Sequence, residues 1–272
     1  NARRANTPIV NVVGDHATYH LQYDALLTSD IVGFARPVSS WVHESKSALT
    51  VAGDAARAVQ AATAAPGGVA TLILPADTAW NEADRPSPKL PEVGPAPVSA
   101  QAIDDVAKLL GNGKKTAILL RGTALRGAGL EAAGRVNAKT GARLLCDTFA
   151  PQIEQGAGRV AVERIPYFAE QIVEFLKGTE QIVLVGSKPP VTFFAYPGKP
   201  SWCAPDGCRF SYLAMPHEDG AGALAVLADA LGARRHDCFN RRLQMVAGCV
   251  HLVAPGIEQC AYRALHAARG RH

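Results

Sequence analysis

The 272-residue sequence predicts an α/β protein with two mostly parallel sheets, each covered by helices on both faces to give two three-layer domains. Short, almost entirely apolar runs alternate with helical patterns along most of the chain. Such runs are typical of strands that are buried on both faces in a parallel sheet. One Pro-rich segment interrupts the alternation, and the apolar fraction of 48% is enough for a core on either side of it.

The first part of the chain, residues 1–81, predicts a strand–helix–strand unit. The opening residues resemble the end of a helix, which Pro8 stops because proline cannot continue it. The expected strand Ile9–Val13 is nearly all apolar, as in strands inside a parallel sheet. The expected helix Val51–Ala64 ends at a Pro-Gly-Gly turn, and a second buried strand follows at Val69–Leu74.

Residues 82–99 predict an extended linker and a domain boundary, because five prolines occur there in a polar context. Residues 100–232 then resume the alternation and predict a central Rossmann-like domain with a mostly parallel sheet. The expected strands are Thr116–Leu120, Arg143–Cys146, Gln181–Val185 and Phe210–Leu213. The expected helices are Ala102–Leu110, Gly129–Thr140, Tyr167–Leu176 and Ala221–Leu231.

The tail, residues 233–272, differs from the rest of the chain in composition. It holds seven Arg, two acidic residues and no Lys, together with half of the Cys and half of the His. Its apolar residues follow no sustained period, so we expect no integral layer of either domain there; translation in a wrong reading frame would give this composition. Its Cys and His residues lack the tight Cys-x2-Cys pair of a zinc finger, so no metal site is assigned. They are Cys249, His251, Cys260 and His266.

The overall composition excludes several classes of protein. A net charge of +4 gives no case for a nucleic-acid partner. No apolar run approaches the roughly 20 residues of a membrane span. The six Cys are scattered without paired spacing, which favours a reducing, cytoplasmic compartment over a disulfide framework.

A series of motifs in residues 1–81 carries a family resemblance. A strand ending in Gly14 is followed by a polar loop, then by Asp24-Ala25-Leu26-Leu27-Thr28, Arg36-Pro37, Trp41 and Pro75-Ala76-Asp77. This order and spacing resemble thiamine-diphosphate (ThDP) enzymes of the acetolactate synthase and benzoylformate decarboxylase type, and the likeness extends over residues 1–232. It implies that residues 1–81 are the C-terminal part of a pyrimidine-binding domain. It also implies a parent enzyme that acts on a small-molecule 2-oxo acid as a homodimer or tetramer.

The resemblance assigns pocket residues one by one. Leu26 and Leu27 stand where acetolactate synthases have Ala-Phe-Gln and where benzoylformate decarboxylases have Ala-Leu-Leu-Thr. They would form apolar walls at the substrate end of the ThDP pocket, across a subunit interface; the alternative is that they fill the core of a short helix. His16 and His20 in the preceding loop could relay protons near the substrate, or could simply bond to backbone or water.

Other motifs give weaker signals. Asp77 follows a buried strand at the edge where α/β sites gather, but in this family the position closes the domain. Trp41 is interpreted as a core residue. The glycine-rich segment Arg121–Gly129 opens a helix after a strand and could approach a nucleotide, although its spacing is not Gly-x-Gly-x-x-Gly. Acetolactate synthases bind FAD in the matching domain, whereas benzoylformate decarboxylases do not, and we favour the version without FAD. The aromatic run from Phe193 predicts a surface loop or interface.

ThDP chemistry also needs a Glu that contacts the aminopyrimidine and a Gly-Asp-Gly…Asn segment that holds Mg²⁺. In the family, the Glu and the catalytic His precede the strand at Ile9, and the metal motif lies in a third domain. No Gly-Asp-Gly occurs in this sequence, so no catalytic residue or metal ligand is assigned. We therefore expect a fragment that is inactive alone, from a parent that uses ThDP and Mg²⁺. The alternatives are a stand-alone nucleotide-binding Rossmann protein and a non-catalytic interaction remnant.

Overall fold

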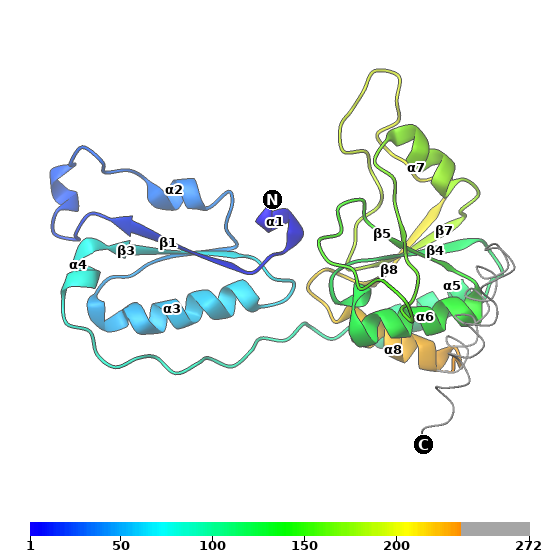
Figure 1. The fold of residues 1–272 in the computed structure, drawn as a ribbon, viewed down its shortest axis with the longest axis horizontal. Helices are drawn as coiled ribbons and strands as arrows, with labels where there is room; N and C mark the ends of the chain where they lie inside the picture. The colour runs from blue at the N-terminus through cyan, green and yellow to red at the C-terminus, as the bar shows by residue number, and fades with distance from the viewer. Residues whose placement is uncertain (235–272) are drawn as a thin grey trace, which may run out of the picture. The chain divides into compact units, whose positions relative to one another are not determined.

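The computed structural model describes residues 1–234, which form two compact units, each with its own sheet (Figure 1). Unit 1 comprises Asn1–Val98 with Ala214–Asp219, and unit 2 comprises Ser99–Leu213 and the chain from Gly220. The predicted α/β class with parallel sheets is confirmed. The expectations for the tail beyond residue 234, including its four candidate zinc ligands, lie outside the described residues. No helix within residues 1–234 is long and apolar enough to cross a membrane.

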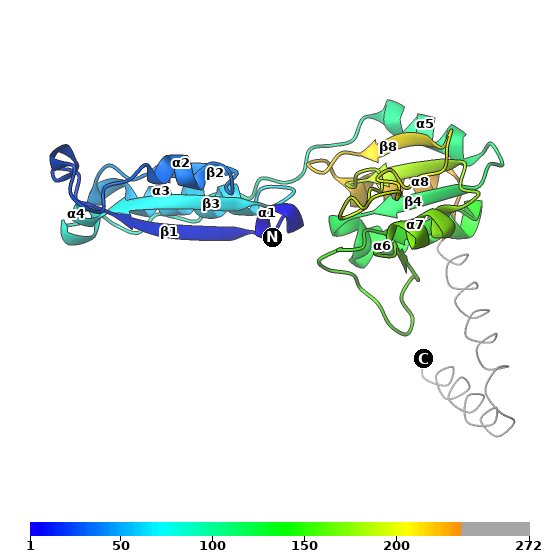
Figure 2. The same cartoon turned by 90° about the horizontal axis from the view of Figure 1, so that it is seen from above.

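Unit 1 is built on a three-stranded parallel sheet in the order β1-β3-β2 (Figure 2). The strands are β1 (Ile9–Asp15), β2 (Trp41–Glu44) and β3 (Val69–Pro75). Helix α3 (Ala48–Thr63) lies along one face and α2 (Ile31–Ala35) on the other (Figure 1). Short helical turns complete the unit: α1 (Ala2–Ala5), η1 (Leu21–Tyr23) and α4 (Ala76–Trp80).

The structure corrects the expected position of β1. Its apolar sequence suggested a strand inside the sheet, but β3 occupies the centre and β1 lies at an edge. β3 is almost wholly buried, whereas Val12 in β1 is 64% exposed. An apolar run shows that a strand can be buried, but it does not show which strands will be its neighbours. In the described residues, β1 pairs with β3 alone.

Alanines hold α3 close to the sheet. Ala58 and Ala62 pack with Ala70 and Leu72 of β3, and Trp41 is partly buried against this cluster. Small side chains let the helix backbone approach the strands, so this core is compact although the sheet is narrow. The interpretation of Trp41 as a core residue agrees with this contact.

A buried carboxylate ties the start of α3 to β2. Asp54 accepts hydrogen bonds from the hydroxyls of Ser45 at 2.7 Å and Thr50 at 3.0 Å, and it pairs with Arg57. His43 Nε2 lies 3.2 Å from the same carboxylate. Burial raises the pKa of Asp54, but the hydrogen bonds and the nearby charge outweigh it, so the net pKa lies below its ordinary value.

Unit 2 contains a five-stranded sheet in the order β6-β5-β4-β7-β8. The strands are β4 (Thr116–Leu120), β5 (Arg143–Cys146), β6 (Glu163–Arg164), β7 (Gln181–Val185) and β8 (Arg209–Ala214). The helices are α5 (Ala100–Leu110), η2 (Gly122–Leu125), α6 (Gly127–Thr140), α7 (Ala169–Leu176) and α8 (Gly220–Ala230). Helix α7 lies on one side of the sheet, and α6 and α8 lie on the other (Figure 1).

Polar contacts join the elements of unit 2 at their ends. Buried Gln181 donates to Thr116 Oγ1 at 2.8 Å and to the Leu109 carbonyl at 3.2 Å, which links α5 to β4 and β7. Arg135 on α6 donates to the Ala233 carbonyl at 2.6 and 3.1 Å, just beyond α8. These bonds satisfy groups at helix ends that burial would otherwise leave unpaired.

Two glycines in helices give a matched test of packing. A Cβ on Gly129 in α6 would lie 2.6 Å from the Thr123 carbonyl oxygen and 2.9 Å from Ala221 Cβ, whereas one on Gly53 in α3 would meet nothing within 4 Å. We expect Gly129→Ala to destabilise unit 2 by about 1–3 kcal/mol through overpacking. We expect Gly53→Ala to stabilise unit 1 by about 0.5–1 kcal/mol. Denaturant unfolding of each variant measures both; a neutral Gly129→Ala would contradict the close packing.

Asp54 should make the stability of unit 1 depend on pH. Because its folded-state pKa is depressed, its contribution is present above the unfolded-state pKa and is lost as the pH falls through the folded value. We expect stability to decline below about pH 4. Asp54→Asn should cost about 2 kcal/mol at neutral pH and flatten the acid limb. Urea unfolding from pH 3 to 7 tests this, with exposed Asp84→Asn as the control; an unchanged acid limb in Asp54→Asn would refute it.

Candidate functional site

The carboxyl edge of the unit 1 sheet brings the predicted site residues into one region. β1 and β3 run parallel in register from Ile9↔Val69 to Asp15↔Pro75, so both strands end side by side. The loop with His16 and His20 leaves the end of β1, and α4 with Asp77 begins directly after β3. Ligands of α/β sheets bind outside this edge, which makes the loop and α4 the candidate site.

Asp77 fastens the loop to α4. Its Oδ1 accepts from the Thr18 amide at 2.8 Å, and its Oδ2 accepts from the Thr18 hydroxyl at 2.6 Å. The hydroxyl bond and the amide bond hold the pKa of Asp77 below its ordinary value. Two more bonds brace the same stretch: the His16 amide donates to Asp15 Oδ1 at 2.7 Å, and the His20 amide donates to the Ala17 carbonyl at 2.8 Å.

The two histidines lie together. The His16 and His20 rings are 5.4 Å apart, and His20 lies 5.8 Å from the Tyr23 ring. His16 Nε2 is buried and has no hydrogen-bond partner. The structure therefore does not support the interpretation that this ring atom is satisfied by backbone. An unpaired buried ring nitrogen is costly in a site that is already formed, and a ligand atom could satisfy it.

Thr28 is a residue to which sequence analysis assigned no role. Its hydroxyl is also buried without a partner, in the same connection between β1 and α2. The Ala25-Leu26-Leu27-Thr28 motif contained the residue, but no pattern in the sequence reports whether a hydroxyl is satisfied. Among the side-chain atoms of this connection, His16 Nε2 and Thr28 Oγ1 are the ones that are buried without a hydrogen-bond partner in the structure.

Leu26 and Leu27 are directed to solvent. They lie in a turn between η1 and α2 and are 99% and 78% exposed. The alternative that both fill the core of a short helix is therefore wrong. Tyr19, Tyr23 and Phe34 are exposed in the same region, so the connection presents an apolar surface. Exposed apolar surface of this kind marks an interaction or ligand site.

The glycine-rich segment of unit 2 does form a turn into a helix. Gly122 and Gly127 have φ values of 62° and 47°, which are left-handed conformations that favour glycine. Arg121 pairs with Asp147 at 3.0 Å across the ends of β4 and β5. Burial raises the pKa of Asp147 and the Arg121 guanidinium lowers it. The effect of burial is larger, so the pKa of Asp147 lies above its ordinary value. The arginine is thus held within the protein by a carboxylate at the place where a nucleotide phosphate would bind.

Aromatic side chains gather at the carboxyl edge of unit 2. The Phe149 ring contacts the rings of Tyr167 and Phe193. The centre of the Phe194 ring lies 4.5 Å from that of Phe193 and 6.4 Å from that of Tyr196. Except for Tyr167, these rings are largely exposed. The predicted surface loop that begins near Phe193 is therefore part of a larger aromatic cluster.

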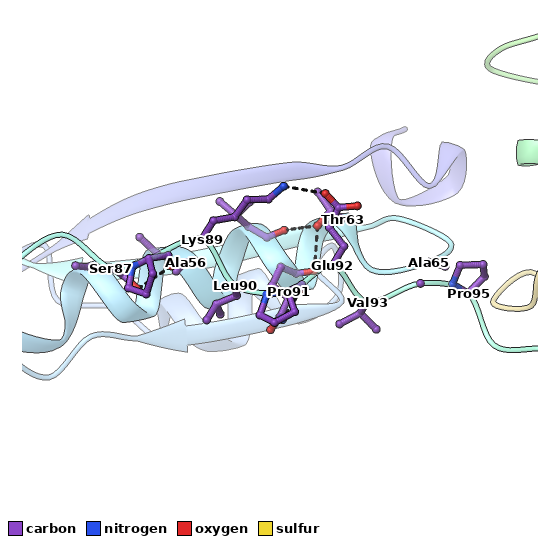
Figure 3. A pocket seen from close by; sticks show the side chains of 16 residues that line it. Ala56, Thr63, Ala65, Ser87, Lys89, Leu90, Pro91, Glu92, Val93 and Pro95 are labelled. Atoms are coloured by element: carbon purple, nitrogen blue, oxygen red, sulfur yellow. Dashed lines mark hydrogen bonds and ion pairs between the residues drawn. The ribbon is translucent and has the colours of Figure 1, made fainter.

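A groove in unit 1 is lined by none of the candidate-site residues at the carboxyl edge of its sheet. Figure 3 shows the extended segment Ser87–Pro95 running beside α3. The groove between them has a volume of about 820 Å³, and seven of its 16 lining residues are alanines or prolines. Gln60 crosses it by donating to the Pro91 carbonyl at 2.8 Å, and Lys89 pairs with Glu92 at 2.8 Å. It brings together no set of convergent polar groups of the kind that fixes a small ligand.

The described donor set does not fit the metal end of ThDP. Residues 1–234 contain no group of three or more His, Cys, Asp or Glu side chains placed to hold a metal ion. A diphosphate needs Mg²⁺ with several oxygen ligands. In the loop region of unit 1, Leu26 and Leu27 present exposed apolar side chains, and His16 Nε2 and Thr28 Oγ1 are buried without hydrogen-bond partners.

Comparison with known proteins identifies a curated homologue. No protein-family model matches the chain. It is 48% identical over 230 residues to a Mycobacterium tuberculosis H37Rv protein named "Putative acetolactate synthase large subunit IlvX". The match covers 84% of this chain and 44% of that protein, so the chain spans less than half the length of its relative.

Solved structures with the same fold carry related names. A "putative thiamin diphosphate-dependent enzyme" from Mycobacterium smegmatis matches with a TM-score of 0.69 at 20% identity over 86% of this chain and 47% of that one. A ThDP-dependent 4-hydroxybenzoylformate decarboxylase from Rhodococcus jostii RHA1 matches with a TM-score of 0.65 at 16% identity, over 84% and 47%. Benzoylformate decarboxylase from Polynucleobacter necessarius matches with a TM-score of 0.65 at 19% identity, and the match covers 85% of this chain and 45% of that chain.

The chain therefore has the fold of ThDP-dependent enzymes. Its resemblance to the acetolactate synthase and benzoylformate decarboxylase type is confirmed, and the M. tuberculosis protein is a homologue at 48% identity.

The exposure of Leu26 and Leu27 has a measurable consequence. Because neither side chain is buried in unit 1, we expect the Leu26→Ser/Leu27→Ser double variant to unfold within about 0.5 kcal/mol of the original protein. Binding of an environment-sensitive apolar dye should fall, because apolar surface is lost. Leu72→Ser, in buried β3, is the matched control and should be strongly destabilised. A large loss of stability in the double variant would show that the leucines are packed.

Proposed function

We propose that this chain is part of a ThDP-dependent enzyme that acts on 2-oxo acids, as an acetolactate synthase-like carboligase or lyase or as a decarboxylase. The exposed apolar surface around Leu26 and Leu27, at the position where the family lines its substrate pocket, carries the proposal. The 48% identity to a protein named as an acetolactate synthase large subunit supports it. ThDP, when bound, supplies the electron sink for cleaving the bond next to the 2-oxo group.

The chain's own residues would act on the substrate rather than on the cofactor. Leu26 and Leu27 would cover the apolar part of a 2-oxo acid and exclude water from it. The Thr28 hydroxyl and His16 Nε2, both unpaired within unit 1, would be free to bond to substrate oxygens. His16, with His20 beside it, would be placed to hold or pass a proton at Nε2.

The residue at position 27 bears on the reaction type. A glutamine in the matching acetolactate synthase motif offers a hydrogen bond, whereas Leu27 offers only apolar surface. This favours a hydrophobic acyl substrate, as in benzoylformate decarboxylases, over the acetolactate reaction. The structure adds that Leu27 is 78% exposed within unit 1, which leaves its side chain available to a substrate or a partner subunit. Because the Leu27 side chain is available to a partner subunit, we also propose a homodimer or tetramer.

We further propose that the chain is inactive by itself. No Gly-Asp-Gly motif that would hold Mg²⁺ occurs in the sequence, and residues 1–234 hold no group of three or more potential metal ligands. The family resemblance places the Glu that activates the aminopyrimidine before the strand at Ile9. Binding of ThDP and Mg²⁺ would therefore need additional polypeptide. Free thiols at Cys146, Cys203 and Cys208 support a cytoplasmic location.

Two other functions correspond to specific observations. A stand-alone nucleotide-binding protein would use the turn at Gly122 and Gly127. The Arg121 guanidinium at that turn is already paired with the Asp147 carboxylate, so it would not be available to a nucleotide phosphate. FAD is disfavoured for the same reason. A non-catalytic interaction module would use the exposed apolar surface, and it would fold stably without any cofactor.

Calorimetric titration with ThDP and Mg²⁺ tests the proposal on two proteins. We expect no saturable heat from the chain alone, because the sequence has no Gly-Asp-Gly motif and residues 1–234 hold no cluster of metal ligands. A polypeptide extended on both sides from the surrounding DNA should bind ThDP and release CO₂ from pyruvate or benzoylformate. Micromolar binding or turnover by the chain alone would refute inactivity in isolation, and an extended protein that binds no ThDP would refute the enzymatic assignment.

A further inference from the structure

The bond between Asp77 and Thr18 closes a long loop in the chain. The two residues are 59 positions apart, yet both carboxylate oxygens are engaged by one residue, through its amide and its hydroxyl. A carboxylate that accepts two such bonds fixes the backbone and the side chain of its partner at the same time. Asp77 is therefore committed to Thr18, which leaves it poorly placed to act as an acid, a base or a metal ligand itself.

Thr18 is the centre of a braced stretch. The amides at alternate positions 16, 18 and 20 each donate to an acceptor inside unit 1: Asp15 Oδ1, Asp77 Oδ1 and the Ala17 carbonyl. Ala17 between them is buried. Only the central bond reaches an element distant in sequence, because Asp15 is the last residue of β1 and Ala17 lies in the loop itself. The position of the stretch relative to the sheet edge thus depends mainly on Asp77.

The side chain held by this bracing is His16. Its ring is fixed well enough for Nε2 to be buried, yet no protein group accepts from or donates to that atom. Leaving a buried polar atom unpaired costs free energy, and the three backbone bonds can offset that cost. This is the arrangement expected of a group that is positioned in advance for a ligand.

The geometry points to Asp77 as a positioning residue, which acts through Thr18 to hold His16 Nε2 ready for an oxygen atom of the 2-oxo acid. This inference rests on the proposed function for the identity of the ligand. It departs from the family-based interpretation of Asp77 as a residue that merely closes the domain, because the two carboxylate bonds go to the loop that carries His16. It differs from a catalytic role because Asp77 itself touches no substrate.

The test uses four substitutions with graded loss of the two bonds. Asp77→Ala removes both acceptors, and Thr18→Val removes the hydroxyl bond only. Thr18→Ser keeps both donors. Asp77→Asn keeps an acceptor for the amide and can donate to the Thr18 hydroxyl. The exposed Asp84, in the linker, provides the control Asp84→Ala.

Hydrogen–deuterium exchange and chemical labelling give the readouts. In Asp77→Ala we expect the amides of His16 and His20, not only that of Thr18, to exchange about tenfold faster, while amides of α3 stay unchanged. His16 should also become reactive to diethylpyrocarbonate, with the exposed His20 as internal reference. Thr18→Val should be intermediate, and Thr18→Ser and Asp77→Asn should resemble the original chain.

Three outcomes would overturn the inference. In the first, exchange accelerates at Thr18 alone, which would show a local bond without effect on His16. In the second, the amides of α3 accelerate equally, which would show that Asp77 stabilises unit 1 as a whole. In the third, His16 stays unreactive in both Asp77→Ala and Thr18→Val. None of the readouts needs ThDP or a 2-oxo acid, so failure here is distinguishable from failure of the proposed function.

Discussion

The parallel pairing of β1 with β3 determines what lies at the carboxyl edge of unit 1. Asp15 and Pro75, the last residues of β1 and β3, lie opposite each other. The segments that follow the two strands therefore begin side by side, and the Thr18 amide donates to Asp77. A slip of one residue would turn every side chain of β1 to the other face and move the loop along the edge. The apolar residues of β3 set this register from the core, where Leu72 and Ala70 pack under α3. The arrangement of the site at the carboxyl edge thus depends on the packing of α3 against β3 in the core of unit 1.

The two units handle polar groups differently. In unit 2, polar side chains such as Gln181 close helix ends and strand starts, and Arg121 is matched by Asp147, so its carboxyl edge is internally paired where a nucleotide would be expected. In unit 1, Asp54 is saturated by its neighbours, but His16 and Thr28 each keep one unpaired atom beside exposed leucines. Unit 2 also holds a buried carboxylate oxygen without a hydrogen bond, Glu154 Oε2, but that atom pairs with Arg159 at 2.7 Å, so unit 1 is the better candidate for chemistry.

The sequence was sufficient for elements whose signal is local. β4, β5 and β7 have the predicted bounds because each is a continuous apolar run between turn residues. β2 was not predicted, since Trp41-Val42-His43-Glu44 is short and mixed in character. The edge position of β1 depends on strand order, which no local pattern encodes. Within the site, the motif order located the loop and its leucines, but the Thr18–Asp77 bond spans 59 positions and the unpaired Thr28 hydroxyl depends on its surroundings, so neither could be read from spacing.

The bonds from Arg135 to the Ala233 carbonyl define how far unit 2 can be shortened. Ala233 is buried, and its carbonyl accepts two bonds from the guanidinium on α6. A chain that stops at Leu231 would lose this acceptor and leave the guanidinium with Asp229 alone at that helix end. One that stops at Arg234 would keep the whole contact. The natural cut for producing unit 2 on its own therefore falls a few residues after the last turn of α8, rather than at the end of the helix itself.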